Sequence, residues 1–198
     1  MKKTDMTKKE CDEYLGVILN NSKRANCLLT ELFELSQMDS PEFSLNPVKT
    51  DICEYIRQIC GELVPQFERE CFNYEFNILE ESVFVMLDTD RFGRIIQNLA
   101  NNAMRYNPRG TLISISLTVQ NDRAVIDFRD NGIGIPAHLA DNIFKPFVRV
   151  DDSRNSKTGG SGLGLSIAKK IAEAHGGDLT LRLDENQGST FQITIPTI

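Results

Sequence analysis

Apolar residues recur with a four-three spacing through the first 40 residues of the chain. The recurring positions are Cys11, Leu15, Ile18, Ser22, Ala25, Leu29, Leu32 and Ser36. This spacing, with no proline between residues 9 and 38, predicts one long helix. Tyr14, Leu28 and Leu35 widen the apolar stripe, as in a helix of a bundle. One helix cannot bury such a stripe, so it needs another helix, a second copy of the chain, or the remaining domain folded back on it.

The pattern becomes mixed after a break at residues 39–43, which predicts a helical segment over 1–40 and a second domain over 41–198. Further helices are predicted at 51–69, with Asp51 as N-cap, at 88–106, at 137–143 and at 162–175. Strands are predicted at 48–50, 74–78, 83–86, 111–120, 123–130, 179–183 and 190–195. We expect 74–78 to pair with 83–86, and 111–120 to form a hairpin with 123–130 around Asn121-Asp122. This mixture favours an α+β fold, a two-layer sandwich with a mixed sheet covered by helices on one face.

Composition narrows the classes of function. The net charge is −6 and the pI is near 5.0, which argues against a nucleic-acid or anionic-membrane surface. No apolar run approaches the roughly 20 residues that span a bilayer, and no secretory signal opens the chain. The five cysteines form no C-x-x-C pair, so we expect reduced thiols in a cytosolic compartment and no zinc site.

Three asparagines gather on the predicted helix at 88–106. Asn98 and Asn102 lie four residues apart and therefore on one face, with Asn101 beside them. An amide oxygen is a suitable Mg²⁺ ligand beside phosphate oxygens. Arg105 and Tyr106 follow, adding a guanidinium suited to phosphate and a ring suited to stacking on a base. The alternative is a polar helix face that merely meets solvent.

A carboxylate and two glycines follow the strand at 123–130, in the run Asp130-Asn-Gly-Ile-Gly134. Glycines at 132 and 134 allow a ligand to approach the main chain closely. A carboxylate is a poor phosphate ligand but a good acceptor for an exocyclic amine, and adenine has one. The alternative is an ordinary strand-to-loop turn.

A glycine-rich run, Gly159–Leu165, precedes the predicted helix at 162–175. Its backbone N–H groups and the positive end of the helix would together favour an anion. The run lacks the Gly-Lys-Ser/Thr of a Walker A loop, and a flexible linker is the alternative. The polar segment 149–161 is predicted to be a mobile lid, with Arg149, Arg154 and Lys157 as candidate phosphate contacts.

Four blocks in a fixed order resemble the N, G1, F and G2 boxes of sensor histidine kinases. They are Asn98-Leu-Ala-Asn-Asn-Ala103, Asp130-Asn-Gly-Ile-Gly134, Phe144-Lys-Pro-Phe147 and Gly160-Ser-Gly-Leu-Gly164. The resemblance covers about residues 47–198. It implies the ATP-binding fold that these kinases share with gyrase and MutL. The first 40 residues resemble the second helix of the dimerisation domain that precedes the catalytic domain in that family.

The resemblance implies a role for each matching residue. Asn102 and Asn98 would hold Mg²⁺, Arg105 would reach the phosphates, Tyr106 would flank the base, and Asp130 would accept from the adenine amine. Gly132, Gly134 and Ile135 would shape the floor, and Ser189 stands where the family usually has Thr near the adenine. Arg149, Lys157, Gly160, Ser161, Gly162, Leu163 and Gly164 would close over the triphosphate. Phe144 and Phe147 are expected to be packing residues that anchor the lid.

The implied function is transfer of the γ-phosphoryl group of Mg-ATP to a histidine, and from there to a response regulator. The related hydrolases carry a glutamate base where this chain has Asn98, and an amide cannot take a proton from water. An ATP hydrolase of the same fold and an anti-sigma-like serine kinase or regulatory module are the alternatives. A cytoplasmic location and a homodimer through the first helix are expected.

The acceptor histidine is expected to lie outside this chain. The chain has two histidines, and neither falls in the predicted helix at 9–38. His138 is expected to be a surface residue of a short helix. His175 is expected to be a favourable cation at a helix C-terminus.

Overall fold

The computed structural model describes residues 7–40, 42–148, 161–183 and 188–198. The chain divides into two compact units, Met1–Ser40 and Pro41–Ile198. Among the described residues, no helix is both long enough and apolar enough to cross a membrane.

The first unit contains helix α1 (Lys8–Met38), which spans 31 residues and matches the helix predicted from the four-three spacing. Several side chains of the predicted stripe are exposed, with exposed fractions of 56% for Leu15, 62% for Ile18, 66% for Leu29 and 47% for Leu32. These side chains are therefore open to an apolar partner.

The second unit is built on a five-stranded sheet with the order β2-β4-β5-β7-β6. Its strands are β2 (Asn73–Ile78), β4 (Leu112–Gln120), β5 (Arg123–Asp130), β6 (Asp178–Leu183) and β7 (Ser189–Pro196). β2 runs parallel to β4, and the other neighbours are antiparallel. A separate two-stranded sheet pairs β1 (Val48–Asp51) with β3 (Phe84–Leu87).

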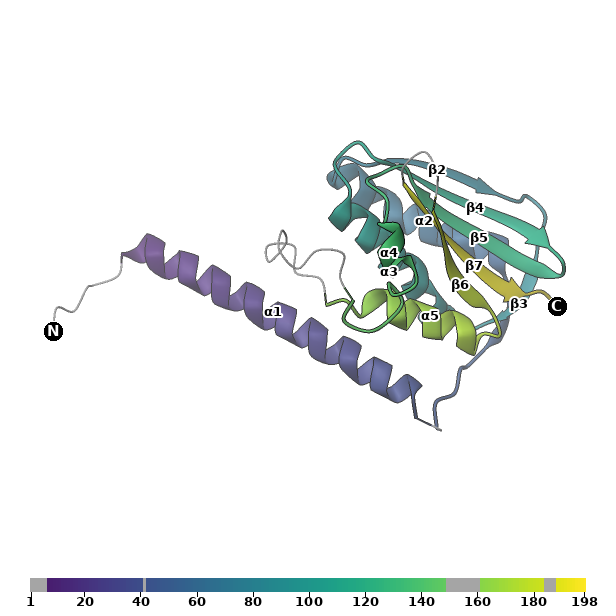
Figure 1. The fold of residues 1–198 in the computed structure, drawn as a ribbon, viewed down its shortest axis with the longest axis horizontal. Coiled ribbons are helices and arrows are strands. Elements are labelled where there is room, and N and C mark those ends of the chain that lie inside the picture. The colour runs from purple at the N-terminus through teal and green to yellow at the C-terminus, as the bar shows by residue number, and fades with distance from the viewer. Residues whose placement is uncertain (1–6, 41, 149–160, 184–187) are drawn as a thin grey trace. The chain divides into compact units, whose positions relative to one another are not determined.

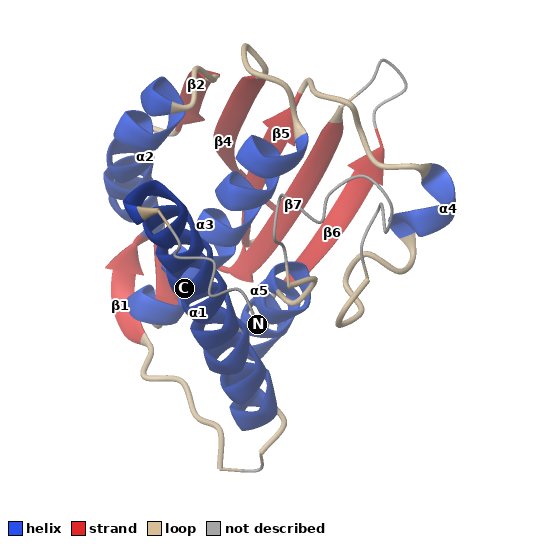
Figure 2. Ribbon diagram, turned by 90° about the vertical axis from the view of Figure 1, so that its left-hand side faces the viewer, coloured by secondary structure: helices blue, strands red, loops and turns tan. Residues whose placement is uncertain are grey.

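Three helices cover one face of the large sheet, as Figures 1 and 2 show. They are α2 (Ile52–Arg69), α3 (Thr89–Tyr106) and α5 (Gly164–Ala174), and the short α4 (Ala137–Ala140) follows β5 in the chain. Alternate residues of β4 and β5 are buried beneath them, among them Ile115 and Phe128. Phe92, Ile95 and Leu99 of α3 complete this layer of the core. The predicted α+β sandwich with helices on one face is confirmed.

The predicted pairing of residues 74–78 with 83–86 is wrong. β2 pairs with β4, where Tyr74 lies opposite Ile113 and Phe76 opposite Ile115, and β3 pairs with β1. Alternation in a strand fixes which side chains face the core, but it does not fix the partner strand. The consecutive strands β2 and β3 therefore belong to two different sheets.

Local signals set several element ends. Asp51 caps α2 by accepting a hydrogen bond from the Cys53 N–H at 3.0 Å, as predicted. Asn121 and Asp122 both have positive φ (49° and 57°), which suits the two-residue turn of the β4–β5 hairpin. Two helices are shorter than predicted: α5 begins at Gly164 rather than 162, and α4 ends at Ala140 rather than 143.

His175 is not a solvated cation at a helix end, and that prediction is wrong. Its Nε2 accepts a hydrogen bond from the backbone N–H of Asp88 at 3.0 Å, and its Nδ1 lies 2.8 Å from the carbonyl oxygen of Ile171. One nitrogen must accept and the other donate, so this arrangement requires the neutral ring with its proton on Nδ1. The ring also packs edge-on against Phe92 at 5.6 Å between centroids. His175 therefore joins the end of α5 to the start of α3.

We expect His175→Ala to lower the free energy of unfolding by about 1–3 kcal/mol, because the N–H of the buried Asp88 loses its acceptor. Urea unfolding followed by circular dichroism measures this change. His138→Ala is the matched control, because His138 is exposed and should change stability by less than about 0.5 kcal/mol. Equal unfolding midpoints for the two variants would contradict the assignment.

Candidate functional site

A buried carboxylate lies at the end of strand β5. The residue Asp130 is only 4% exposed. Its Oδ1 accepts hydrogen bonds from the Gly132 N–H at 3.0 Å and from Asn107 Nδ2 at 3.1 Å, and its Oδ2 accepts from Ser189 Oγ at 2.6 Å. A buried charge is tolerated only when it is paired or hydrogen-bonded, and here three donors serve that purpose.

Three elements bring these donors together. The antiparallel register of β5 and β7 places Ser189 directly opposite Asp130. Helix α3 is followed by its C-cap residue Asn107, whose backbone is extended as expected before a proline. Asn107 Oδ1 also accepts a hydrogen bond from the Ile133 N–H at 3.0 Å. One end of the sheet, one helix end and one loop therefore form a single polar cluster, which we call the Asp130 cluster (Asn107, Asp130, Gly132, Ile133 and Ser189).

The backbone approaches itself closely beside this cluster. A Cβ built on Gly188 would lie 2.2 Å from the carbonyl oxygen of Asp130, and Gly188 has a φ of +101°. A Cβ built on Gly134 would lie 3.1 Å from the Gly188 oxygen. Neither position can carry a side chain without movement of the neighbouring backbone. The surface beside the Asp130 cluster is therefore formed by backbone atoms of Gly134 and Gly188.

Sequence reasoning missed Asn107 and Gly188. Asn107 belongs to Asn107-Pro108-Arg-Gly110, which indicated only the end of a helix. Its side-chain role depends on Asp130, 23 residues away. Gly188 directly precedes Ser189, and its contact with the Asp130 carbonyl arises only once β5 and β7 pair.

The polar face of α3 also contacts helix α5. Asn98 Nδ2 donates a hydrogen bond to the Gly164 carbonyl oxygen at 3.0 Å, which ties α3 to the first turn of α5. Asn101 is exposed and accepts from Gln97 Nε2 at 3.1 Å. Asn102 is half-buried, and within the described ranges no hydrogen bond engages its amide. Its oxygen is therefore available to a ligand.

Two further predicted site residues, Arg105 and Tyr106, occupy the last turn of α3. Arg105 is exposed and Tyr106 is half-buried, next to the cap residue Asn107. Both therefore lie near the Asp130 cluster along the chain, at the end of the helix where the polar face of α3 finishes.

In the described part of the glycine-rich run, hydrogen bonds hold the backbone of Gly162 and Leu163. Gly162 has a φ of +75°, and its carbonyl oxygen accepts the Phe147 N–H at 2.9 Å. The Leu163 side chain is buried, its N–H donates to Ser161 Oγ at 3.1 Å, and its carbonyl oxygen accepts from Ser166 Oγ at 2.8 Å. Residues 149–160 of the predicted lid, with Arg149, Arg154, Lys157 and Gly160, lie outside the described residues.

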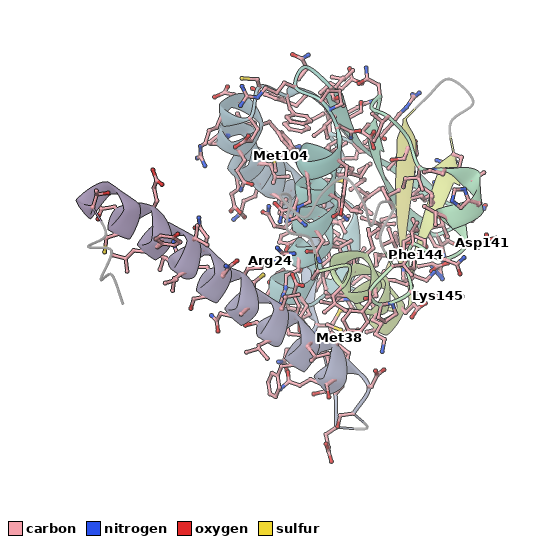
Figure 3. All side chains as sticks on the ribbon, turned by 60° about the vertical axis from the view of Figure 1, so that its left-hand side comes forward. Arg24, Met38, Met104, Asp141, Phe144 and Lys145 are labelled. Atoms are coloured by element: carbon pink, nitrogen blue, oxygen red, sulfur yellow. The ribbon has the colours of Figure 1, made fainter. Side chains whose placement is uncertain are left out.

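The two phenylalanines of the predicted F box differ. Phe144, which is labelled in Figure 3, packs edge-on against Phe191 at 6.3 Å between ring centroids. Lys169 Nζ lies 5.5 Å from the centroid of the Phe144 ring. Phe147 is 63% exposed, so the prediction that its side chain packs is wrong. Its φ of +65° turns the chain so that its backbone N–H, rather than its ring, is held by Gly162.

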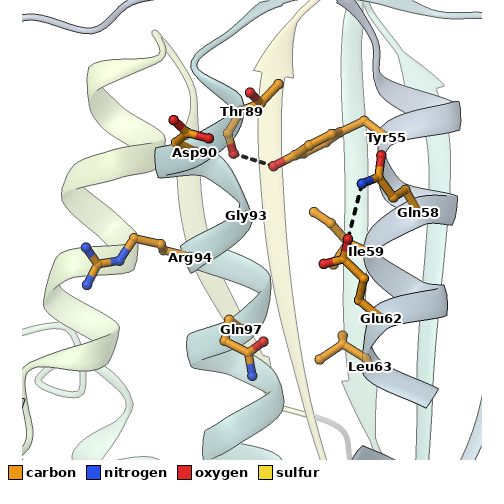
Figure 4. A pocket seen from close by; sticks show the side chains of 10 residues that line it. All are labelled: Tyr55, Gln58, Ile59, Glu62, Leu63, Thr89, Asp90, Gly93, Arg94 and Gln97. Carbon is orange, nitrogen blue, oxygen red and sulfur yellow. Dashed lines mark hydrogen bonds between the residues drawn. The ribbon is translucent and has the colours of Figure 1, made fainter. Parts of the chain in front are cut away.

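A groove of about 470 Å³ lies between α2 and the first half of α3 (Figure 4). Tyr55 crosses it and donates a hydrogen bond to the Thr89 carbonyl oxygen, and burial raises the pKa of Tyr55 to about 12. A Cβ on Gly93 would lie 2.9 Å from Tyr55 Oη. Gln58 donates to Glu62 at 3.1 Å. The Gln58–Glu62 hydrogen bond lies within α2, whereas the Tyr55–Thr89 hydrogen bond joins α2 to α3, so the groove is a feature of helix packing.

The chemistry of the Asp130 cluster suits an adenine nucleotide. Asp130 Oδ2 receives a single hydrogen bond from the described residues, so it can accept another from an amine. Asn102 offers a neutral oxygen, and the N-terminus of α5 favours an anion. Among the described side chains, no group of three or more His, Cys, Asp or Glu could hold a metal ion.

Known proteins have sequences similar to this one. Residues 87–198 match the family model of histidine kinase-, DNA gyrase B-, and HSP90-like ATPases. The sensor histidine kinase WalK of Bacillus subtilis (strain 168) is 33% identical over 187 residues, covering 92% of this chain and 30% of that protein. The sensor protein VanSC of Enterococcus gallinarum is 30% identical over 185 residues, covering 93% of this chain and 50% of that protein. The chain therefore spans half or less of the length of these relatives.

Solved structures share the fold. Histidine kinase ThkA, solved in complex with the response regulator protein TrrA, gives a TM-score of 0.76 at 25% identity, covering 100% of this chain and 55% of that chain. The catalytic domain of ThkA alone, in a nucleotide-free form, gives 0.67 at 27% identity, covering 77% of this chain and 96% of that chain.

The fold and the matched residues define the class of the protein. The chain belongs to the family of histidine kinase-, DNA gyrase B-, and HSP90-like ATPases. Within that family it is an ATP-binding catalytic domain of the sensor histidine kinase type, preceded by a long helix.

Proposed function

We propose that the chain binds ATP or ADP at the Asp130 cluster and transfers the γ-phosphoryl group of Mg-ATP to a histidine outside this chain. A response regulator then takes the phosphoryl group. The single observation that carries the proposal is the buried Asp130 carboxylate, held by three hydrogen bonds with acceptor capacity left on Oδ2. The structure of ThkA with TrrA supports the response regulator as the partner class.

Each residue has one task in this proposal. Asp130 accepts the hydrogen bond of the adenine amine, while Ser189 holds its carboxylate from β7. Gly132, Gly134 and Ile135 form the floor, and Tyr106 flanks the base. Asn102 supplies an oxygen to Mg²⁺, assisted by Asn98. The phosphates are contacted by Arg105, Arg149, Lys157, Gly160, Ser161, Gly162, Leu163 and Gly164.

The state of Asn98 supports phosphoryl transfer rather than rapid hydrolysis. Its Nδ2 is committed to the Gly164 carbonyl oxygen, so its oxygen is the atom left for Mg²⁺. An amide cannot act as a general base toward water. Bound Mg-ATP supplies the phosphoryl group, and the role of the chain is to position it and to balance its charge.

The first unit supports a dimer of this chain. We assign residues 1–40 to the second helix of a dimerisation hairpin and residues 41–198 to the catalytic domain. The exposed Leu15, Ile18, Leu29 and Leu32 side chains would be buried between two copies, and a two-fold axis is the commonest closure. The chain would be the cytoplasmic portion of a longer parent protein that carries the acceptor histidine.

We expect the chain to bind ATP in preference to GTP, and Asp130→Asn to weaken ATP binding by about 1–3 kcal/mol, because the amine loses its charged acceptor. Titration calorimetry measures both quantities. Asp127→Asn is the matched control on the same strand, because Asp127 pairs with Arg182 and Gln192 rather than with the cluster. Equal affinities for ATP and GTP would overturn the assignment of the base site.

We expect no phosphohistidine on this chain after incubation with γ-labelled Mg-ATP. Both nitrogens of His175 are hydrogen-bonded, and His138 is an exposed residue of α4. Acid-labile, base-stable label should appear only when a longer form with the preceding helix is added. Stoichiometric acid-labile label on the 198-residue chain alone would contradict the proposal.

We expect a weak dimer in light scattering, because each copy would contribute a single helix to the interface. Ile18→Glu combined with Leu29→Glu should give monomers, since the charges would fall within the apolar stripe. Val17→Glu is the control, because Val17 is equally exposed but lies off the four-three spacing. A monomer at every concentration of the unsubstituted chain would favour the helix folding back on the catalytic unit instead.

A further inference from the structure

We propose that Asn107 is a positioning residue for base recognition. Its amide fixes the Asp130 carboxylate so that Oδ2, and not Oδ1, faces the 6-amino group of adenine. The inference rests on the proposed binding of adenine nucleotides and adds a residue that determines how selective that binding is.

Both ends of the Asn107 amide are engaged. Nδ2 donates to Asp130 Oδ1 at 3.1 Å, and Oδ1 of Asn107 accepts from the Ile133 N–H at 3.0 Å. The same side chain therefore holds the carboxylate and the loop that follows it. These two contacts also fix the orientation of the amide, because exchanging its nitrogen and oxygen would break both of them.

The backbone of Asn107 is itself restrained. Its N–H donates to the Ala103 carbonyl oxygen at 3.1 Å as the cap of α3, and Pro108 restricts it to the extended conformation. The amide thus projects from the rigid end of a helix. A group supported in this way can hold its partner within the narrow geometry that recognition needs.

The two carboxylate oxygens of Asp130 accept different numbers of hydrogen bonds. Oδ1 accepts from Gly132 N–H and Asn107 Nδ2, which fills the roughly two acceptor positions of a carboxylate oxygen. Oδ2 accepts from Ser189 Oγ alone among the described residues. An incoming amine therefore meets its free acceptor on Oδ2. Without Asn107, Oδ1 would regain capacity and the carboxylate could turn about its terminal torsion.

The Asn107 side chain occupies the space that a side chain at position 132 would need. A Cβ built on Gly132 would lie 1.8 Å from Asn107 Oδ1 and 2.7 Å from Nδ2, so any side chain there would displace the amide. The need for glycine at this position thus follows from the space that Asn107 occupies. Gly132→Ala should disturb base recognition in the same way as a substitution of Asn107 itself.

The test compares two probes, ADP and purine riboside 5′-diphosphate, which carries hydrogen in place of the 6-amino group. The wild-type chain should bind ADP more tightly, because only ADP donates to Oδ2. Asn107→Ala should reduce this ratio of affinities by about tenfold, the size of one hydrogen bond to a charged group. Binding of the purine analogue should change less than twofold. Asn101→Ala is the control, since Asn101 is an exposed asparagine of the same helix.

A second variant separates the two ends of the amide. Asn107→Asp keeps an acceptor for the Ile133 N–H but loses the donor to Asp130, and it should lower the ratio as Asn107→Ala does. Gly132→Ala should also lower it, and Gly132→Ala with Asn107→Ala should cost little more than Asn107→Ala alone, because the clash is then relieved. Thermal unfolding confirms that each variant is folded.

The outcomes distinguish this inference from the function on which it rests. If the wild-type chain binds the two probes equally or binds neither, the proposed adenine site itself fails. If the wild type prefers ADP but Asn107→Ala weakens both probes equally, or leaves both unchanged, Asn107 has no role in base recognition. A ratio that falls for Asn107→Ala but not for Asn107→Asp would assign the effect to the Ile133 loop and overturn the proposal.

Discussion

The burial of the Asp130 carboxylate constrains the end of the sheet where β5 stops and β7 starts. Asp130 is charged and lies under the surface, so it must be surrounded by donors. Those donors come from the end of α3, from the loop after β5 and from the start of β7. The register of β5 with β7 and the length of α3 are thereby fixed relative to one another. A ligand amine would complete this arrangement, because the acceptor is already oriented and desolvated before binding.

Helix α3 connects the parts that such a site requires. At its start, Asp88 caps the helix and donates its N–H to His175 at the end of α5. Along its length, Asn98 binds the Gly164 carbonyl at the start of α5. At its end, Asn107 holds Asp130 and the following loop. Hydrogen bonds therefore join α3, which carries Asn102, to α5 at both ends of α5. Electrostatic positioning of a phosphoryl group requires groups that are held in place in this way.

Much of this architecture could be predicted from the sequence, and the failures have a common cause. The four-three spacing predicted α1, and the predicted cap Asp51 marked the start of α2, because these signals are local. The Asp130 motif was visible because its residues are adjacent in the chain. The partners of β2 and β3, the neutral state of His175 and the role of Asn107 were missed, since each depends on a contact between residues far apart in sequence. Phe147 was misjudged because an apolar residue type does not show that its side chain is buried.

A crystal structure of the chain with a non-hydrolysable ATP analogue and Mg²⁺ tests the central claim most directly. The account predicts that the adenine 6-amino nitrogen lies at hydrogen-bond distance from Asp130 Oδ2, about 2.7–3.2 Å, with Asn107 Nδ2 still on Oδ1. It also predicts the Asn102 amide oxygen in the coordination shell of the metal. A base that contacts Asp130 through Oδ1 with Asn107 turned away, or a nucleotide bound in the groove between α2 and α3, would contradict it.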